Sequence, residues 1–200
     1  MFKYVSDISD LSHSIIENHL EKRVVAIDAT LGNGYDTDFL CERFEKVYSF
    51  DVQEEACLNY KLKNKENVSV INDSHHKFKE YVLEDKVNVI NDSHHKFKEY
   101  VLEDKVNCIM YNLGFLPGGN KEITTLAKTT MKSIEEGLEL LDSNGIMTIA
   151  VYRGHAEGKN EEHFIMEYVR NLPKNIYGVM LHEYLNRAKT APLLIVIEKK

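Results

Sequence analysis

The stretch from Val24 to Thr37 constrains the fold of this chain more than any other segment. It reads VVAIDATLGNGYDT, which is an apolar run of strand length, a turn with two glycines and the start of a helical pattern. Gly32 and Gly34 have no Cβ and therefore allow the backbone to turn tightly. The helix that follows would direct its free N–H groups into the crevice at the end of the strand. The segment predicts a nucleotide-binding strand, turn and helix.

Three residues near this turn indicate which nucleotide binds. Asp28 ends the strand, where its negative charge favours a cationic ligand and opposes a pyrophosphate. Thr37 stands where the dinucleotide pattern G-x-G-x-x-G has its third glycine, which argues against NAD. Asp51 ends the second expected strand, at the distance typical of a carboxylate that binds ribose hydroxyls. A sulfonium ligand, S-adenosylmethionine, fits all three features.

Strands and helices alternate along most of the chain. We expect strands at residues 24–29, 46–52, 68–72, 106–112, 145–152, 177–184 and 193–198, and helices at 8–20, 35–44, 53–63, 122–142 and 160–171. This alternation predicts an α/β, Rossmann-like fold with a seven-stranded, mostly parallel sheet and helices on both faces. No helix separates the last two strands, so we expect them to pair as a hairpin with an antiparallel last strand. Asn144 and Gly145 are expected to end the helix at 122–142, whose apolar face includes Leu126.

The composition is that of one globular domain. The chain has 200 residues, of which 43% are hydrophobic, so residues 1–200 are expected to form a single domain. No apolar run approaches membrane-spanning length and no basic-then-apolar leader opens the sequence, which predicts a soluble, cytoplasmic protein. Cys41, Cys57 and Cys108 lack metal-ligand spacing and are expected to be reduced, mostly buried thiols.

The net charge of -7 argues against a broadly basic nucleic-acid-binding protein, because phosphate contacts need clustered Lys and Arg. It is still compatible with a local basic patch. Five basic residues fall in loops that would follow strands: Lys121, Arg153, Lys159, Arg187 and Lys189. An ordinary scatter of surface charge explains these residues equally well.

One segment of the sequence occurs twice in tandem. The unit VINDSHHKFKEYVLEDKVN spans residues 70–88 and returns without a change at residues 89–107. Two identical copies do not make a repeat architecture, so we expect no function of the duplication itself. We expect the first copy to supply the third strand and the second to form an insertion at the face opposite the ligand crevice, where a longer loop costs little entropy.

A second polar and glycine-rich segment follows the fourth expected strand. Residues 112–119 read NLGFLPGG and would lie over the same crevice. The side-chain oxygen of Asn112 can accept hydrogen bonds from an amine and so orient its lone pair toward a methyl group. Phe115 is placed to stack on a base. The segment favours methylation of an amine, and an ordinary glycine-rich loop is the alternative.

The paired histidines do not indicate a metal site. His75-His76 and His94-His95 would point apart on a regular backbone, and no cysteine or further carboxylate completes a ligand set. We therefore expect no metal.

Three other side chains have two readings each. His155 follows the fifth strand, where it is placed to take a proton or to touch a phosphate, or is a plain loop histidine. His13 is interpreted as a packing or hydrogen-bonding residue of the first helix. Tyr152 is expected to line the target pocket, or else to be a core residue at the end of its strand.

Taken as a whole, the chain resembles the class I methyltransferases of the rRNA methylase family of the YtqB/MnmM type. The segments that carry the resemblance are Ser12-His13, residues 28–37, residues 50–53, Asp-Ser-His in either repeat copy, residues 112–119 with Lys121, residues 152–155 and Asn186. They cover nearly the full chain apart from the extra copy. The resemblance implies S-adenosylmethionine-dependent N-methylation of 5-aminomethyl-2-thiouridine at the tRNA wobble position, giving the 5-methylaminomethyl form, with the anticodon arm as partner.

The resemblance also implies roles for single residues. The methionine end of the cofactor would be held by Asp28, Thr30, Gly32, Asn33, Gly34, Asp36 and Thr37, the ribose by Asp51 and Gln53, and the adenine side by Asp73, Ser74 and His75 or by Asp92, Ser93 and His94. The catalytic residues would be Asn112, which also faces the cofactor, Phe115 and His155. The substrate would contact Gly114, Lys121, Tyr152, Arg153 and Asn186.

Some features depart from the family pattern and leave alternatives open. Leu31, Tyr35 and Arg153 vary family positions, and the duplication leaves the adenine-side carboxylate ambiguous. A small-molecule methyltransferase on the same fold is favoured by the acidic charge balance. An rRNA methyltransferase on that fold is another alternative. A non-catalytic protein that binds S-adenosylmethionine or another nucleotide is a third interpretation. A homodimer is compatible with a domain of this size that must grip an anticodon arm.

Overall fold

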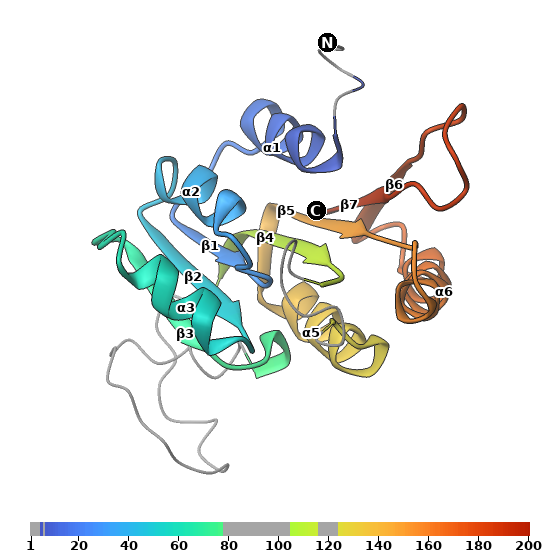
Figure 1. Cartoon of the computed structure of the whole chain (residues 1–200). Helices are drawn as coiled ribbons and strands as arrows, with labels where there is room; N and C mark the ends of the chain where they lie inside the picture. Colours follow the sequence, from blue (N-terminus) through green and yellow to red (C-terminus); the bar gives the residue numbers. More distant parts are fainter. Residues whose placement is uncertain (1–4, 6, 78–104, 116–123) are drawn as a thin grey trace.

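The computed structural model describes residue 5 and residues 7–77, 105–115 and 124–200 (Figure 1). Its strands are β1 (Val25–Asp28), β2 (Lys46–Asp51), β3 (Val68–Asn72), β4 (Val106–Leu113), β5 (Leu141–Val151), β6 (Tyr177–His182) and β7 (Leu193–Lys199). Its helices are α1 (Ile8–His19), α2 (Tyr35–Cys41), α3 (Glu54–Lys61), α5 (Ala127–Leu140) and α6 (Ala156–Arg170), with a short 3-10 turn, η1 (His75–Lys77).

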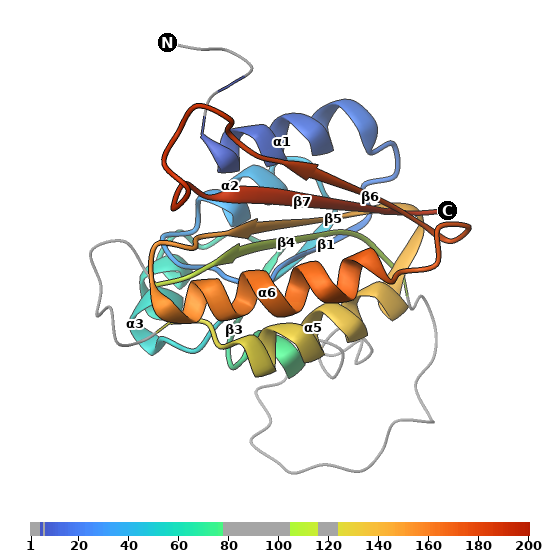
Figure 2. The same ribbon diagram turned by 90° about the vertical axis from the view of Figure 1, so that its right-hand side faces the viewer.

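All the strands form one sheet in the order β3-β2-β1-β4-β5-β7-β6. The first five pair in parallel, whereas β7 runs antiparallel to both β5 and β6. The predicted seven-stranded, mostly parallel sheet with an antiparallel last strand is confirmed. Because parallel strands end at the same edge, the residues that follow β1, β2, β4 and β5 gather on one side of the molecule, the side where α6 begins in Figure 2.

Apolar side chains alternate between the two faces of the sheet, and each face is covered by helices (Figures 1 and 2). Ala26 and Met110 face α1 and α2, where they join a cluster with Ile16 and Leu40. On the opposite face a larger cluster is completed by α5 and α6. It includes Ile27, Ile109, Tyr111, Ile149, Ile134, Leu138, Ile165 and Val169. The sheet is thus fixed from both sides, and its polar edge is held as one unit.

The third strand comes from the first repeat copy. β3 begins two residues before that copy and pairs with β2 from Val47↔Val68 to Asp51↔Asn72. Val106 and Asn107, the last residues of the second copy, open β4. The expectation that the first copy supplies the strand is confirmed.

Several predicted boundaries are wrong by a few residues. The helix predicted at 122–142 is described from Ala127 to Leu140, and Leu126 is its exposed N-cap residue and not part of the apolar face. Asn144 and Gly145 do not end that helix, because β5 already begins at Leu141, which is buried and pairs with Val106. The ladder shifts register between Val106 and Cys108, so the turn-like residues form an irregularity inside the strand.

Two further boundaries differ. α6 begins at Ala156, four residues before the predicted helix at 160–171, because His155 caps it through its own side chain. β6 ends at His182, before the predicted end at residue 184.

The three cysteines are free thiols, with Cys57 and Cys108 buried and Cys41 partly buried, which agrees with the prediction. Within the described ranges, no helix is both long and apolar enough to cross a bilayer. The same part of the chain holds no cluster of three or more His, Cys, Asp or Glu side chains placed to bind a metal ion.

Candidate active site

The glycine turn has the strained geometry that only glycine tolerates well. Gly34 has a φ of +82° and caps α2, and a Cβ placed on it would lie 2.2 Å from the ring of Tyr60. The backbone N–H of Gly34 donates to the carbonyl of Leu31 at 2.7 Å, which closes the turn. The predicted strand, turn and helix are therefore present, and the first N–H groups of α2 point toward the polar edge of the sheet.

Asp28 ends β1 as predicted, but its carboxyl lies beneath the turn. It is fully buried, and its two oxygens accept the N–H of Thr30 at 3.0 Å and the hydroxyl of Thr37 at 2.6 Å. The Thr37 hydroxyl also bonds Ser49 of β2 at 2.8 Å. Burial, reinforced by the charge of Asp36, raises the pKa of Asp28 to about 7. Asp28 thus ties β1, the turn and β2 together.

Asp51 holds the other side of the turn. Its carboxylate accepts the backbone N–H of Gly32 and of Gln53, each at 2.9 Å. The side chain is only partly buried, and each carboxylate oxygen keeps a further lone pair. The position at the end of β2 and these free lone pairs suit the binding of two vicinal hydroxyls, as the sequence predicts.

A third carboxylate, Asp36, joins α1, α2 and β4. One oxygen lies 2.6 Å from Nε2 of His13, and the other accepts the side-chain N–H of Asn112 at 2.6 Å. The ring of His13 stacks on Phe39 with centroids 4.0 Å apart. The Asn112 amide also donates to the Ser9 hydroxyl at 3.2 Å.

These contacts fix which way the Asn112 amide faces. Both donors of its NH₂ group are used, by Asp36 and by Ser9, so its orientation follows from the hydrogen-bond network. Its Oδ1 atom is buried and has no hydrogen-bond partner among the described residues. A buried acceptor left without a donor is costly, and its natural use is to receive a donor from a ligand.

The described part of the segment after β4 lies against the start of α6. The N–H of Gly114, whose φ is +139°, donates to the Thr125 hydroxyl at 2.9 Å. Phe115 is 37% exposed and its ring centroid lies 5.7 Å from that of His155. Of the predicted catalytic residues, Phe115 and His155 are therefore neighbours, whereas the Asn112 amide contacts Ser9 and Asp36. Lys121, predicted to contact the substrate, lies outside the described residues.

The cap on α6 decides the chemistry of His155. Its Nδ1 atom accepts the backbone N–H of Gly158 at 3.0 Å, so the neutral ring carries its proton on Nε2. Nε2 is buried and has no hydrogen-bond partner among the described residues. In this tautomer His155 is a donor toward a ligand, and the proton-accepting role considered from the sequence does not suit it.

The other predicted substrate residues divide into two groups. Tyr152 is 40% exposed, and burial raises the pKa of its hydroxyl while a hydrogen bond with Ser9 lowers it. Asn186 is exposed in the loop between β6 and β7. The guanidinium of Arg153, in contrast, binds the carbonyl of Ala191 at 2.8 Å and the carboxylates of Glu162 and Glu183 at 2.8 and 2.5 Å. Arg153 therefore anchors this loop to α6.

The predicted adenine side is less uniform. Asp73 accepts the N–H of Ser74 at 2.7 Å and the ammonium of Lys77 at 3.0 Å. His75 is buried, and its ring centroid lies 6.0 Å from that of Tyr111. Its backbone carbonyl accepts the Ser133 hydroxyl at 3.1 Å. Burial lowers the pKa of the His75 ring to about 4. This ring packs against the core. The alternative residues Asp92, Ser93 and His94 lie outside the described residues.

One of the two buried polar contacts was anticipated from the sequence and the other was missed. His13, expected to be a packing or hydrogen-bonding residue of the first helix, does both, since it stacks on Phe39 and bonds the buried carboxylate of Asp36. Glu161 was not singled out, yet it is fully buried and bonds two threonines. The available signal was its spacing: Glu161 precedes Ile165 and Val169 by four and eight residues, so it falls on the apolar stripe of α6.

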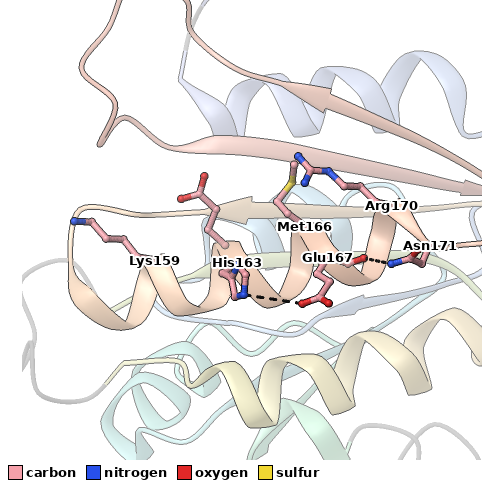
Figure 3. Close-up of a pocket in the computed structure, with 7 residues that line it drawn as sticks. Lys159, His163, Met166, Glu167, Arg170 and Asn171 are labelled. Atoms are coloured by element: carbon pink, nitrogen blue, oxygen red, sulfur yellow. Dashed lines mark hydrogen bonds and ion pairs between the residues drawn. The ribbon is translucent and has the colours of Figure 1, made fainter.

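Two grooves of the described surface are lined by residues outside this constellation. One of about 760 Å³ runs along α6 and is lined by Lys159, Glu162, His163, Met166, Glu167, Arg170 and Asn171 (Figure 3). Another of about 260 Å³ lies between α1 and β6 and includes Ile8, Leu11, Leu181 and Tyr184. None of these lining residues was predicted to bind the cofactor.

The sheet order, the glycine turn after β1 and the carboxylate at the end of β2 together define a class I methyltransferase. A family model described as "Putative rRNA methylase" matches residues 79–198. The chain therefore belongs to the rRNA methylase family.

Individual relatives agree with this assignment. The tRNA (mnm5s2U34)-methyltransferase of Arabidopsis thaliana, which is chloroplastic, is 30% identical over 208 residues, covering 96% of this chain and 69% of that protein. A "putative methyltransferase" of Streptococcus mutans, solved with SAH, superposes with a TM-score of 0.79 at 34% identity, covering 98% and 99% of the two chains. An rRNA methylase of Streptococcus thermophilus gives a TM-score of 0.73 at 27% identity, with the same coverage.

Proposed function

We propose that this protein uses S-adenosylmethionine to convert 5-aminomethyl-2-thiouridine at the tRNA wobble position to 5-methylaminomethyl-2-thiouridine. The observation that carries the proposal is the oriented amide of Asn112, whose buried oxygen has no hydrogen-bond partner among the described residues. An acceptor of this kind suits a substrate amine. The nucleoside is proposed from the plant relative, which is a tRNA (mnm5s2U34)-methyltransferase. We further propose that residues 1–200 act as one domain, since every described strand belongs to one sheet.

The cofactor site is assigned to the residues around the glycine turn. Asp51 and Gln53 would hold the ribose, and the turn from Thr30 to Gly34 would hold the methionine end, with Asn33 between the two glycines. The donor set fits the cofactor, because the Asp51 carboxylate and the N-terminus of α2 lie at the same edge of the sheet. The first N–H groups of a helix have no intrahelical acceptor and can bind a ligand. When bound, S-adenosylmethionine supplies an electrophilic methyl group. Asp73 and Ser74 of the first repeat copy would lie on the adenine side.

The chain's own contribution to catalysis is orientation. Asn112 Oδ1 would accept an N–H of the neutral amine and hold its lone pair in line with the methyl group. Phe115 would stack on the base. His155 would donate its Nε2 proton to an acceptor of the substrate, in keeping with its capping tautomer. The proton that the amine loses would pass to water or to Asp36, the carboxylate in contact with Asn112.

The anticodon arm would dock beside the loop between β6 and β7. The guanidinium of Arg187 lies 3.7 Å from the centroid of the Tyr184 ring, and Leu185 is 99% exposed. Lys189 and Asn186 are exposed in the same loop. Flat, basic and apolar groups together suit an RNA strand with unstacked bases.

Two further proposals concern the protein's state in the cell. A homodimer is supported by β6, a sheet-edge strand with exposed Val179, Met180 and Leu181, and light scattering tests it. A cytoplasmic location is supported by three free cysteines, and fractionation tests it.

The decisive experiment combines calorimetry with a methyl-transfer assay. Calorimetry should show binding of S-adenosylmethionine, and nucleoside analysis should show the methylaminomethyl product on tRNA that lacks the final methyl group. Turnover should fall steeply with added salt, because phosphate contacts release counterions. Salt-insensitive turnover of a free amine would replace this proposal with a small-molecule methyltransferase. Binding without transfer to any acceptor would leave a non-catalytic binding protein.

A further inference from the structure

Glu161 is a buried carboxyl that the proposed chemistry does not use. It lies on α6 on the same stripe as Ile165 and Val169, and no part of the residue is exposed. Burial raises the pKa of its carboxyl, and the hydrogen bonds from two threonines lower it. Burying a carboxyl costs free energy unless its oxygens accept hydrogen bonds, so the groups that donate to Glu161 indicate its structural role.

The partners of Glu161 belong to the segment that leads into α5. Oε1 accepts the hydroxyl of Thr130 at 2.7 Å, and Oε2 accepts the hydroxyl of Thr125 at 2.9 Å. Thr130 is buried in the second turn of α5, and Thr125 precedes that helix. Glu161 therefore links α6 to α5 and to the residues just before α5.

Thr125 carries the link onward to the acceptor side of the site. Its hydroxyl accepts the N–H of Gly114 at 2.9 Å, and its own N–H donates to the carbonyl of Gly114 at 3.1 Å. Phe115 pairs with Thr124 in an isolated antiparallel bridge. Gly114 stands between Leu113 of β4 and Phe115, two residues after Asn112. One chain of hydrogen bonds thus runs from Glu161 through Thr125 to the backbone beside Asn112.

The first turn of α6 is held by contacts with α5 and with the end of β5, which fixes the position of Glu161 on the same helix. Glu157 accepts the N–H of Ala127 at 2.9 Å and so caps α5, whose N-cap residue Leu126 makes no side-chain cap bond. A Cβ on Gly158 would lie 2.1 Å from the carbonyl oxygen of Tyr152, which shows how closely α6 approaches the end of β5.

We propose that Glu161 is a positioning residue that sets the backbone of Gly114, and through it the placement of Asn112 and Phe115, by way of the Thr125 hydroxyl. The inference rests on the proposed function, because the positioned residues are those assigned to the methyl acceptor. A misplacement of about 1 Å at such residues is enough to cost on the order of a hundredfold in rate.

Two threonine substitutions separate positioning from folding. Thr125→Val and Thr130→Val each remove one hydroxyl from Glu161, but only Thr125 also contacts Gly114. We expect Thr125→Val to lower kcat at least tenfold with KM for S-adenosylmethionine within about threefold of wild type. Thr130→Val, which leaves the Gly114 contact in place, should lower kcat clearly less. Thr125→Ser keeps the hydroxyl and should restore most of the turnover.

A readout independent of activity separates this inference from the proposed function. Amide hydrogen exchange at Gly114 should be protected in wild type and in Thr130→Val, and should speed up at least tenfold in Thr125→Val at matched global stability. If the wild-type protein does not methylate tRNA but the exchange rates at Gly114 follow this pattern, only the proposed function is overturned. Equal exchange at Gly114 and equal kcat loss in the two valine variants would overturn the positioning role of Glu161.

Discussion

The two sides of the proposed site, a cofactor side around the glycine turn and an acceptor side around Asn112, are built in different ways. Around the glycine turn the linked residues are close in sequence: nine residues separate Asp28 from Thr37, and 19 separate Gly32 from Asp51. On the acceptor side, 76 residues separate Asp36 from Asn112, and 103 separate Ser9 from Asn112. The cofactor side is therefore a local motif, whereas the contacts of Asn112 need α1, α2 and β4, which lie far apart in the sequence, to come together.

The largest effect is expected on the cofactor side, from Gly34→Ala. The substitution places a Cβ at a φ of +82° and 2.2 Å from the Tyr60 ring, so it should destabilise the protein by about 3 kcal/mol and abolish binding of S-adenosylmethionine. Denaturant unfolding and calorimetry measure the two effects. Gly178→Ala is the matched control, because a Cβ there meets nothing within 4 Å. Similar losses of stability and binding in both variants would mean that the turn does not require a glycine at residue 34.

The next largest effect should come from Asn112→Ala on the acceptor side. Without the oriented amide oxygen, kcat should fall on the order of a hundredfold while the Kd of S-adenosylmethionine stays within about threefold. Single-turnover assays and calorimetry separate the two quantities. If kcat and the affinity for S-adenosylmethionine fall equally, Asn112 belongs to the cofactor side, and the two sides of the site are less distinct.

The same contrast explains what the sequence could predict. Continuous apolar runs such as Val25 to Asp28 and the glycine turn are local signals, so the sheet, its order of elements and the carboxylates that end β1 and β2 were predictable. Boundaries near Leu141 were not, because β5 extends there only through its pairing with Val106, a contact 35 residues away.

The acceptor side was predicted in part, for a related reason. Asn112 lies near the end of β4 and Phe115 follows that strand, in a glycine-rich segment that marks both residues in the sequence. The partners that give them direction, His13 and Asp36 for the amide and Glu161 for the backbone, lie on other elements. Only the packing of α1, α2 and α6 on the sheet brings these side chains to β4.

A smaller effect is expected from Asp36→Asn, which tests how the acceptor side is held. An asparagine offers one oxygen where Asp36 uses two, so the Asn112 amide loses its fixed orientation and kcat should fall about tenfold. His13→Phe keeps the stacking on Phe39 but removes the bond to Asp36, and should cost about threefold. If calorimetry instead shows the tenfold loss in cofactor affinity, Asp36 serves the methionine end as the family resemblance implies.

The pH dependence of stability should separate two buried groups of opposite sign. The pKa of Asp28 is raised from 3.8 to about 7, so the folded state binds its proton more tightly and stability falls as pH rises across that window. The pKa of His75 is lowered from 6.5 to about 4, so stability falls as pH drops across that window. Asp28→Asn should leave stability rising with pH between about 4 and 6.5, and His75→Phe should leave it falling, by roughly 2 kcal/mol in each case. Denaturant unfolding at several pH values tests both.

The smallest effect should come from the outer face of α6. His163 and Glu167 lie 4.0 Å apart, and their side chains are 73% and 68% exposed (Figure 3). Exposed pairs of this kind contribute little, so Glu167→Gln should change the free energy of unfolding by less than about 0.5 kcal/mol and leave kcat unchanged. Glu161→Gln on the inner face of the same helix should lower kcat severalfold, because one amide cannot accept from both threonines. If the two variants behave alike in unfolding and turnover assays, the acceptor side does not depend on long-range contacts from α6, and the contrast between the two sides of the site fails there.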